Sequence, residues 1–250
     1  MKKKYNYAIL GRNWGVKINN ILKGMHRNSF VINLDYKSLK INEYFEELKK
    51  IIYENNIDII WLAIPPDNHY KICKFIIDCK VNIILEKPVV FNYYQKKILK
   101  NLLIKNNLFL SVHFEYIFLK DLLTFDQNLK FDKVKYVFNH SNKKKNISTS
   151  LDLGIHMIAI KKMYFNDINN YQLKTNFNSE NKRQIIFILN KIIVHKVDFT
   201  NSAQKIIQQF ITYYEKEVMG NIENKLDLDF AFSVYKELLK KINKKKRISL

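Results

Sequence analysis

Three side chains have the types and the spacing to manage a proton or a developing charge: Lys87, Asp152 and His156. Lys87 ends an apolar run between Glu86 and Pro88, and these neighbours would hold its backbone and pair its charge. The alternative for Lys87 is a solvated lysine at the end of a strand. Asp152 and His156 are four residues apart, so on a helix they share one face and can point into one cleft.

Asp152 and His156 also fit a structural account. The helix dipole favours an aspartate in the first turn of a helix, and a histidine on a helix can pack in the core. From the residues alone we favour these structural roles. Gly154, between the two, would allow a ligand or cofactor to approach closely.

The segment GRNWG, residues 11–15, lies between an apolar run and a helical pattern. A glycine-rich turn there lets backbone N–H groups approach a pyrophosphate at the start of a helix. The turn is irregular, because Asn13 and Val16 stand where the dinucleotide fingerprint has glycines and Gly15 comes one place early. Asn13 tolerates left-handed dihedral angles and can partly replace a glycine. An ordinary strand-to-helix turn is the alternative. The candidate cofactor contacts in this turn are Gly11, Arg12, Asn13, Trp14 and Gly15.

Asp35 ends the second expected strand, about 20 residues after the turn, where a carboxylate accepts hydrogen bonds from the adenosine ribose. A carboxylate at that position repels a 2′-phosphate, which favours NAD over NADP. Lys37 and Lys40 weaken this preference, so the cofactor is NAD or NADP with NAD favoured. A solvated loop aspartate is the alternative.

Two prolines, Pro65 and Pro66, follow the third expected strand, and we call this segment the proline lip. Ile64 precedes Pro65, and a residue before proline is biased to extended geometry. Asp67 or Asn68 can cap the helix that follows. His69, at the start of that helix, is either a site residue or a residue held by a structural hydrogen bond.

The alternation of strand-like and helical patterns up to residue 118 predicts βαβ units, and therefore an α/β fold with a doubly wound parallel sheet of the Rossmann type. After that point short strands follow one another, with Asn190 and Lys191 as a tight hairpin turn. This pattern predicts a smaller α+β domain with a mostly antiparallel sheet. The expected strands are residues 5–11, 29–35, 57–64, 81–87, 108–114, 133–140, 171–177, 183–189 and 191–199. The expected helices are residues 14–27, 42–56, 69–79, 94–107, 119–125, 148–165, 202–218 and 227–242.

The net charge of +20 raises the question of nucleic acid, but the positive charge is almost all lysine. Bidentate recognition of bases and phosphates favours arginine. We therefore interpret the charge as scattered, solvated lysines and expect no nucleic-acid partner; a basic nucleic-acid binder is the alternative. The arginines are Arg12, Arg27, Arg183 and Arg247.

The cysteines and the hydropathy pattern point to a reduced, cytoplasmic protein. The only cysteines, Cys73 and Cys79, match no metal or redox motif, so we expect no metal site. No apolar run reaches the roughly 18 residues that a membrane span needs.

Beyond these separate signals, the stretch AIPPDNH (residues 63–69) followed by KVNIILEKPVV (residues 80–90) resembles the signature of the Gfo/Idh/MocA family, the relatives of glucose–fructose oxidoreductase and inositol dehydrogenase. LDLGIHMI (residues 151–158) resembles the family's Asp-x-Gly-x-His helix, and residues 208–242 resemble its C-terminal helix pair. The resemblance covers nearly the whole chain. It implies a dinucleotide-binding domain over residues 1–118 and a shortened substrate and oligomerisation domain over residues 119–250, whose C-terminal helices return to the first domain.

The resemblance implies an NAD(P)-dependent oxidoreductase that acts on the CH–OH group of a sugar, a sugar derivative or a cyclitol. Lys87 would lie between nicotinamide and substrate, with a cis bond to Pro88, and would stabilise a developing alkoxide. His156 would be the general acid/base, and Asp152 would orient it or bind a substrate hydroxyl. The further cofactor contacts implied are Ile64, Pro65, His69, Glu86 and Lys87.

Two departures from the family pattern keep other functions open. The glycine turn is irregular, and residues 111–118 lack an arginine that many relatives carry; His113, Glu115 and Tyr116 lie there instead. A non-catalytic relative that binds a nucleotide or a partner protein is one alternative. An imine reductase or a sugar-nucleotide-processing reductase is another. Assembly into a homo-oligomer, which is common in relatives, is an expectation from the resemblance alone.

Overall fold

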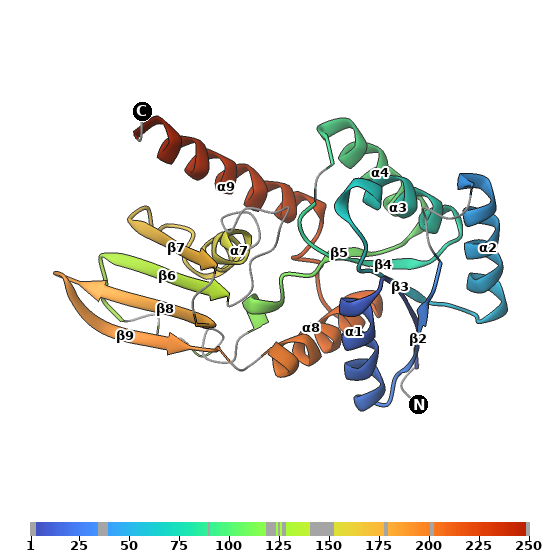
Figure 1. Ribbon diagram of the computed structural model, residues 1–250, viewed down its shortest axis with the longest axis horizontal. Helices are drawn as coiled ribbons and strands as arrows, with labels where there is room; N and C mark the ends of the chain where they lie inside the picture. Colours follow the sequence, from blue (N-terminus) through green and yellow to red (C-terminus); the bar gives the residue numbers. More distant parts are fainter. Residues whose placement is uncertain are drawn as a thin grey trace. The chain divides into compact units, whose positions relative to one another are not determined.

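The computed structural model of the protein describes residues 4–34, 40–89, 91–118, 124, 126, 129–140, 153–177, 180–200 and 203–248 (Figure 1). The chain divides into two compact units. Unit 1 consists of Met1–His113 and Ile211–Phe230, and unit 2 of Phe114–Phe210 and Ala231–Leu250. The division into domains at residue 118 stays a prediction.

A five-stranded parallel sheet forms the centre of unit 1, in the order β2-β1-β3-β4-β5. This confirms the predicted α/β fold with a doubly wound parallel sheet. The strand order reverses between β1 and β3, because the chain moves from β1 to β2 on one side and then to β3 on the other. In open α/β sheets such a switch point is where ligands bind, beyond the carboxyl ends of the strands. The strands are β1 (Asn6–Leu10), β2 (Asn28–Ile32), β3 (Ile59–Leu62), β4 (Asn82–Leu85) and β5 (Leu110–Val112).

Helices cover both faces of this sheet, with α2, α3 and α4 on one face and α1 and the C-terminal half of α8 on the other (Figure 1). All four residues of β3 are fully buried. Burial on both faces explains why this strand reads as a continuous apolar run without alternation. The helices are α1 (Asn13–Gly24), α2 (Ile41–Glu54), the 3-10 turn η1 (Pro66–Asn68), α3 (His69–Asp78), α4 (Tyr93–Asn106) and α8 (Ala203–Val218).

Residues 211–230 complete unit 1 through buried polar contacts. The Tyr214 hydroxyl donates to the carbonyl oxygen of Ile83 at 3.0 Å. Glu215 accepts a hydrogen bond from the Tyr7 hydroxyl at 2.9 Å and forms an ion pair with Arg27 at 2.7 Å. These contacts join the end of α8 to β1, β4 and the segment before β2.

Unit 2 contains a four-stranded mixed sheet in the order β7-β6-β8-β9. Two of its three pairings are antiparallel, and β6 pairs with β7 in parallel, which confirms the mostly antiparallel sheet. Asn190 and Lys191 both have positive φ (51° and 71°), as a two-residue hairpin turn between β8 and β9 requires. The remaining elements are β6 (Lys133–His140), β7 (Tyr171–Phe177), β8 (Lys182–Leu189), β9 (Ile192–Asp198), the 3-10 turn η2 (Glu115–Phe118), α7 (Gly154–Tyr164) and α9 (Leu228–Ile248).

Some expectations fall on residues outside the described set. The helix expected over residues 119–125 lies almost wholly outside it, as does the first part of the helix expected from residue 148. Cys73 and Cys79 are buried free thiols on and just after α3, while the reduced, cytoplasmic setting stays a prediction. Within the residues that the structure describes, none of the helices has the length and hydropathy of a bilayer span.

Candidate functional site

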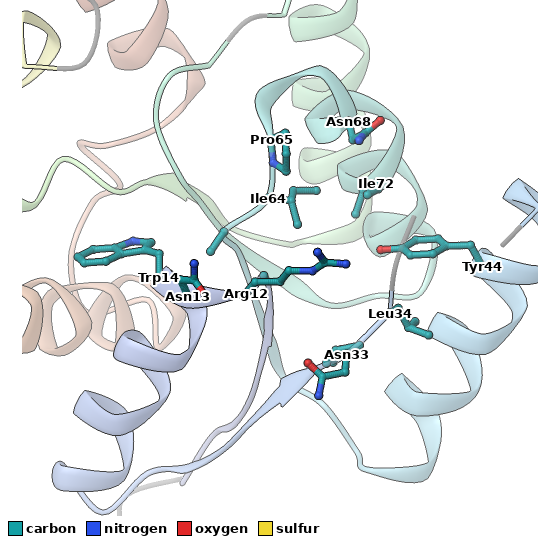
Figure 2. Close-up of a pocket in the computed structure, with 13 residues that line it drawn as sticks. Arg12, Asn13, Trp14, Asn33, Leu34, Tyr44, Ile64, Pro65, Asn68 and Ile72 are labelled. Atoms are coloured by element: carbon teal, nitrogen blue, oxygen red, sulfur yellow. The ribbon is translucent and has the colours of Figure 1, made fainter. Parts of the chain in front are cut away.

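A cavity of about 610 Å³ opens at the switch point of the sheet in unit 1 (Figure 2). The segments that follow β1, β2 and β3 form most of its wall, and α2 and α3 contribute one side chain each. The cavity therefore lies where the fold predicts a ligand. Its lining residues are Gly11, Arg12, Asn13, Trp14, Ile32, Asn33, Leu34, Tyr44, Ala63, Ile64, Pro65, Asn68 and Ile72.

Gly11 is required by the close approach of two strand ends. A Cβ atom at Gly11 would lie 2.4 Å from the carbonyl oxygen of Ala63 and 2.8 Å from its Cβ. Both distances are shorter than any ordinary contact, so only glycine fits without moving β1 or β3. The first glycine of the predicted turn thus shapes the floor of the cavity.

Gly15 has a different role, because it does not line the cavity. It is buried in the first turn of α1, and a Cβ there would lie 3.1 Å from the Cγ2 of Ile9 on β1. Close packing of helix on strand is the task of the third glycine in the dinucleotide fingerprint. The glycine that comes one place early therefore still supplies that packing.

The start of α1 suits an anion. In the described structure no side chain caps its first turn, and that turn holds no acidic residue. The first N–H groups of a helix lack partners within the helix and carry partial positive charge. Asn13 begins the helix and lines the cavity, so these N–H groups lie at the cavity wall.

The far end of the cavity lies beside the end of β2. Asn33 and Leu34 follow that strand, and Tyr44 of α2 lies beside Leu34 at this end (Figure 2). The side chain of Arg12 points toward this end and away from Trp14. Asp35, the predicted ribose partner, comes directly after Leu34 but lies outside the described residues.

The proline lip contributes Ile64, Pro65 and Asn68 to the wall. His69 does not line the cavity. Its buried ring donates from Nε2 to the carbonyl oxygen of Ile64 at 2.9 Å, and burial lowers its pKa. The structure thus shows the structural hydrogen bond that was the alternative for His69, and this bond fixes the cavity-lining backbone of Ile64.

Glu86 follows β4 and accepts three hydrogen bonds on one oxygen. Its Oε1 accepts from Trp14 Nε1 at 3.0 Å, Trp61 Nε1 at 3.0 Å and His113 Nδ1 at 2.8 Å. Burial alone would raise the pKa of Glu86. The charge and hydrogen bond of His113, the hydrogen bond of Trp14 and the charge of Lys87 outweigh burial and lower that pKa.

Lys87 is half-buried, and its bond to Pro88 is cis, as the family resemblance implied. Its positive charge contributes to the lowered pKa of Glu86. Neither Glu86 nor Lys87 lines the cavity, although Trp14, which Glu86 holds, does. Their predicted contact with the cofactor stays a prediction.

In unit 2, His156 lies in the first turn of α7 and is 3% exposed. Its ring packs edge-on against the ring of Tyr116, with centroids 4.7 Å apart. Asp152 lies outside the described residues. A Cβ atom at Gly154 would lie 3.1 Å from the Cδ1 of Leu238, so Gly154 accommodates α9, where we had expected a ligand or cofactor.

Sequence reasoning missed several residues of the site. Asn33, Tyr44 and Ala63 line the cavity, and Trp61 and His113 hold Glu86. The one local signal was Ala63, a small residue at the end of an apolar run. The other residues lie at the site only because of the order of the strands in the sheet, which no local pattern in the sequence indicates.

Comparison with known proteins agrees with this architecture. Residues 10–114 match the profile of an oxidoreductase family with an NAD-binding Rossmann fold. No protein among the curated sequences matches the chain.

Among solved structures, the chain is similar to a dehydrogenase (MviM) from Clostridium difficile, with 18% identity, a TM-score of 0.73 and coverage of 97% of this chain and 100% of that chain. It is similar to UDP-N-acetylglucosamine 3-dehydrogenase GnnA from Acidithiobacillus ferrooxidans, with 11% identity, a TM-score of 0.74 and coverage of 95% and 96%. It is also similar to scyllo-inositol dehydrogenase from Lactobacillus casei, with 12% identity, a TM-score of 0.74 and coverage of 96% and 95%. At these identities the likeness establishes a shared fold. The match covers nearly the whole length of these three structures. The shortening of the second domain relative to the family stays a prediction.

Proposed function

We propose that the protein, whose residues 10–114 are the NAD-binding Rossmann domain of a Gfo/Idh/MocA oxidoreductase, transfers a hydride between an NAD(P) cofactor and the CH–OH carbon of a sugar, a sugar derivative or a cyclitol. The observation that carries the proposal is the cavity at the switch point, floored by Gly11 and bordered by the start of α1. Its chemistry and place in the fold fit a dinucleotide.

The wall residues suggest how the chain would hold the dinucleotide. The N–H groups at the start of α1 suit the pyrophosphate. Asn33 and Leu34, at the end of β2, lie where the adenosine ribose binds in this fold. When bound, the nicotinamide supplies or accepts the hydride, so the protein's own task is to orient it and to manage the proton.

The catalytic roles of Lys87, Asp152 and His156 are proposed from the sequence motifs that contain them. Lys87 would stabilise negative charge on the substrate oxygen, and His156 would give or take the proton. Asp152 would orient His156 or bind a substrate hydroxyl. The charge of Lys87 helps to lower the pKa of the buried Glu86, which supports an electrostatic role for this lysine at the end of β4.

The preference between the cofactors depends on two residues at the adenosine end of the cavity. Asp35 follows Leu34 in the sequence and favours NAD, because its carboxylate would repel a 2′-phosphate. Arg12 points toward the same end and can pair with a 2′-phosphate (Figure 2). We propose NAD or NADP as cofactor, with NAD favoured.

The first experiment is calorimetric titration with NAD, NADH, NADP and NADPH. We expect at least one of them to bind with a single site per chain. A screen of sugars, sugar nucleotides and cyclitols then follows the absorbance of the reduced nicotinamide. Binding without turnover of any substrate would favour the non-catalytic alternative, and failure of all four to bind would refute the oxidoreductase.

A further inference from the structure

We infer that Glu86 is a positioning residue for the cofactor cavity, and that its buried carboxylate holds the indole of Trp14, a residue of the cavity wall at the start of α1. The identity of the ligand, a nicotinamide dinucleotide, rests on the proposed function. The position of the indole does not, because it depends only on contacts within unit 1.

Three ring N–H groups from three segments converge on one oxygen atom. Trp14 comes from the start of α1, Trp61 from β3, and His113 follows β5, while Glu86 itself follows β4. A carboxylate oxygen only accepts hydrogen bonds, so each ring must present an N–H group to it. For His113 this fixes a proton on Nδ1.

The buried charge makes this cluster costly to disturb. Glu86 is 8% exposed, and a buried carboxylate is tolerated only when hydrogen bonds and nearby positive charge compensate for lost solvation. Its lowered pKa shows that compensation is achieved here. Replacing the carboxylate with a neutral group would leave three donors facing a weaker acceptor.

Only one of the three donors reaches the cavity. Trp61 and His113 are both buried, and their rings pack edge-to-face with centroids 4.9 Å apart. Trp14 is half-buried and lines the end of the cavity opposite Tyr44 (Figure 2). Glu86 therefore acts on the cavity through Trp14.

The indole of Trp14 extends away from the other lining residues (Figure 2), and its one polar atom is bound to Glu86. The ammonium group of Lys17 lies 5.2 Å from the centroid of the ring, which adds positive charge near the start of α1. A ring fixed in this way would hold the first turn of α1, whose N–H groups border the cavity. A ring released from Glu86 would lose that effect while the rest of the cavity remained.

The chain supplies a direct reporter, because Trp14 and Trp61 are its only tryptophans. In Trp61→Phe, Trp14 is the sole indole, and its emission and acrylamide quenching report its position without any cofactor. Adding Glu86→Gln to Trp61→Phe should shift the emission to longer wavelength and increase the quenching constant about two-fold or more. Unchanged emission and quenching would overturn the positioning role, whatever the cofactor data show.

The second measurement is the dissociation constant of the dinucleotide that binds the wild type most tightly. Trp14→Phe keeps an aromatic ring and removes the N–H group. The control, Tyr94→Phe, changes an exposed ring on α4 that does not line the cavity. We expect Trp14→Phe and Glu86→Gln each to weaken binding about ten-fold, the equivalent of one hydrogen bond to a charged group. Tyr94→Phe should change it less than about two-fold.

The double variant Trp14→Phe/Glu86→Gln completes a double-mutant cycle for dinucleotide binding. If Glu86 acts through Trp14, the double variant should bind about as weakly as either single variant, because the same contact is lost. Additive losses of binding, or an equal loss in Tyr94→Phe, would overturn the inference. Cooperative thermal unfolding of each variant provides the check on folding. Failure of the wild type to bind any dinucleotide would refute the proposed function and the ligand named here, while the fluorescence result would still decide the positioning of Trp14.

Discussion

Gly11 lies so close to Ala63 that a Cβ atom at Gly11 would stand 2.4 Å from the Ala63 carbonyl oxygen. This contact joins the end of β1 to the end of β3, the two strands that border the switch point. The floor of the cavity is therefore set by a backbone-to-backbone approach. Side chains of the wall can vary around it, but the glycine cannot.

Gly11→Ala should lower the free energy of unfolding by about 1–3 kcal/mol, the usual cost of an added methylene in a tightly packed place. It should also abolish measurable dinucleotide binding, because the strand ends must separate. Denaturant unfolding and calorimetry measure the two effects. Gly24→Ala is the control, since nothing lies within 4 Å of its added Cβ and it ends α1, the helix that follows Gly11. Equal behaviour of the two variants would contradict the structural role of Gly11.

Local patterns in the sequence were enough to predict the parallel sheet and the glycine turn after its first strand, while the binding of a phosphate there stays a prediction. Gly11, the apolar run of β3 and the prolines after it are contiguous signals, and each marks a boundary of the cavity. Trp61 and His113 could not be predicted as partners of Glu86. They meet it only because β3, β4 and β5 are neighbours in the sheet, a relationship that no local pattern contains.

Unit 2 shows the same limit for a glycine. Gly154 lies between Asp152 and His156, and we expected it to allow a ligand or cofactor to approach closely. In the structure the neighbour is Leu238 of α9, which is more than eighty residues away in the sequence. A glycine in the sequence can indicate that another group approaches the backbone closely, but the sequence does not identify that group.

Arg12→Gln should reduce the affinity for NADP and NADPH about ten-fold while changing the affinity for NAD and NADH much less. The guanidinium points toward the adenosine end of the cavity, and a bidentate pair with a 2′-phosphate is a strong hydrogen-bonded contact (Figure 2). Calorimetry with the four dinucleotides measures the change. Lys23→Gln removes one positive charge from the last turn of α1, the helix that follows Arg12. It should leave the ratio of the NADP affinity to the NAD affinity unchanged. A uniform loss for all four ligands would exclude a specific contact with the 2′-phosphate.

Lys87→Ala should lower turnover by about two orders of magnitude or more, the range for one group that stabilises a developing oxyanion. The affinity for the dinucleotide should change little, because Lys87 does not line the cavity. Lys74→Ala, on the exposed face of α3, removes the same charge and should retain full activity. Steady-state kinetics and calorimetry separate the two effects, and retained turnover in Lys87→Ala would remove it from the catalytic residues.

His156→Gln should lower turnover by about 10²-fold or more if the imidazole transfers a proton. Glutamine keeps much of the side-chain volume beside Tyr116, so the packing of α7 should survive. His195→Gln on the exposed strand β9 is the control. If His156→Gln lost thermal stability but kept its turnover number, His156 would be a packing residue.

Glu217 should make the free energy of unfolding of unit 1 depend on pH. Burial raises its pKa to about 7, although the Ser111 hydroxyl donates to its Oε2 at 2.6 Å and opposes that rise. Because the folded state then holds this proton more tightly than the unfolded state, the free energy of unfolding should fall as the pH rises from about 4.5 to about 7 and should level off above it. Glu217→Gln mimics the protonated carboxyl and should remove this fall. Urea unfolding at pH 5 and pH 8 measures both proteins: the variant should match the wild type at pH 5 and be more stable at pH 8. A wild type that is as stable as Glu217→Gln at pH 8 would show that the carboxylate is accommodated without cost.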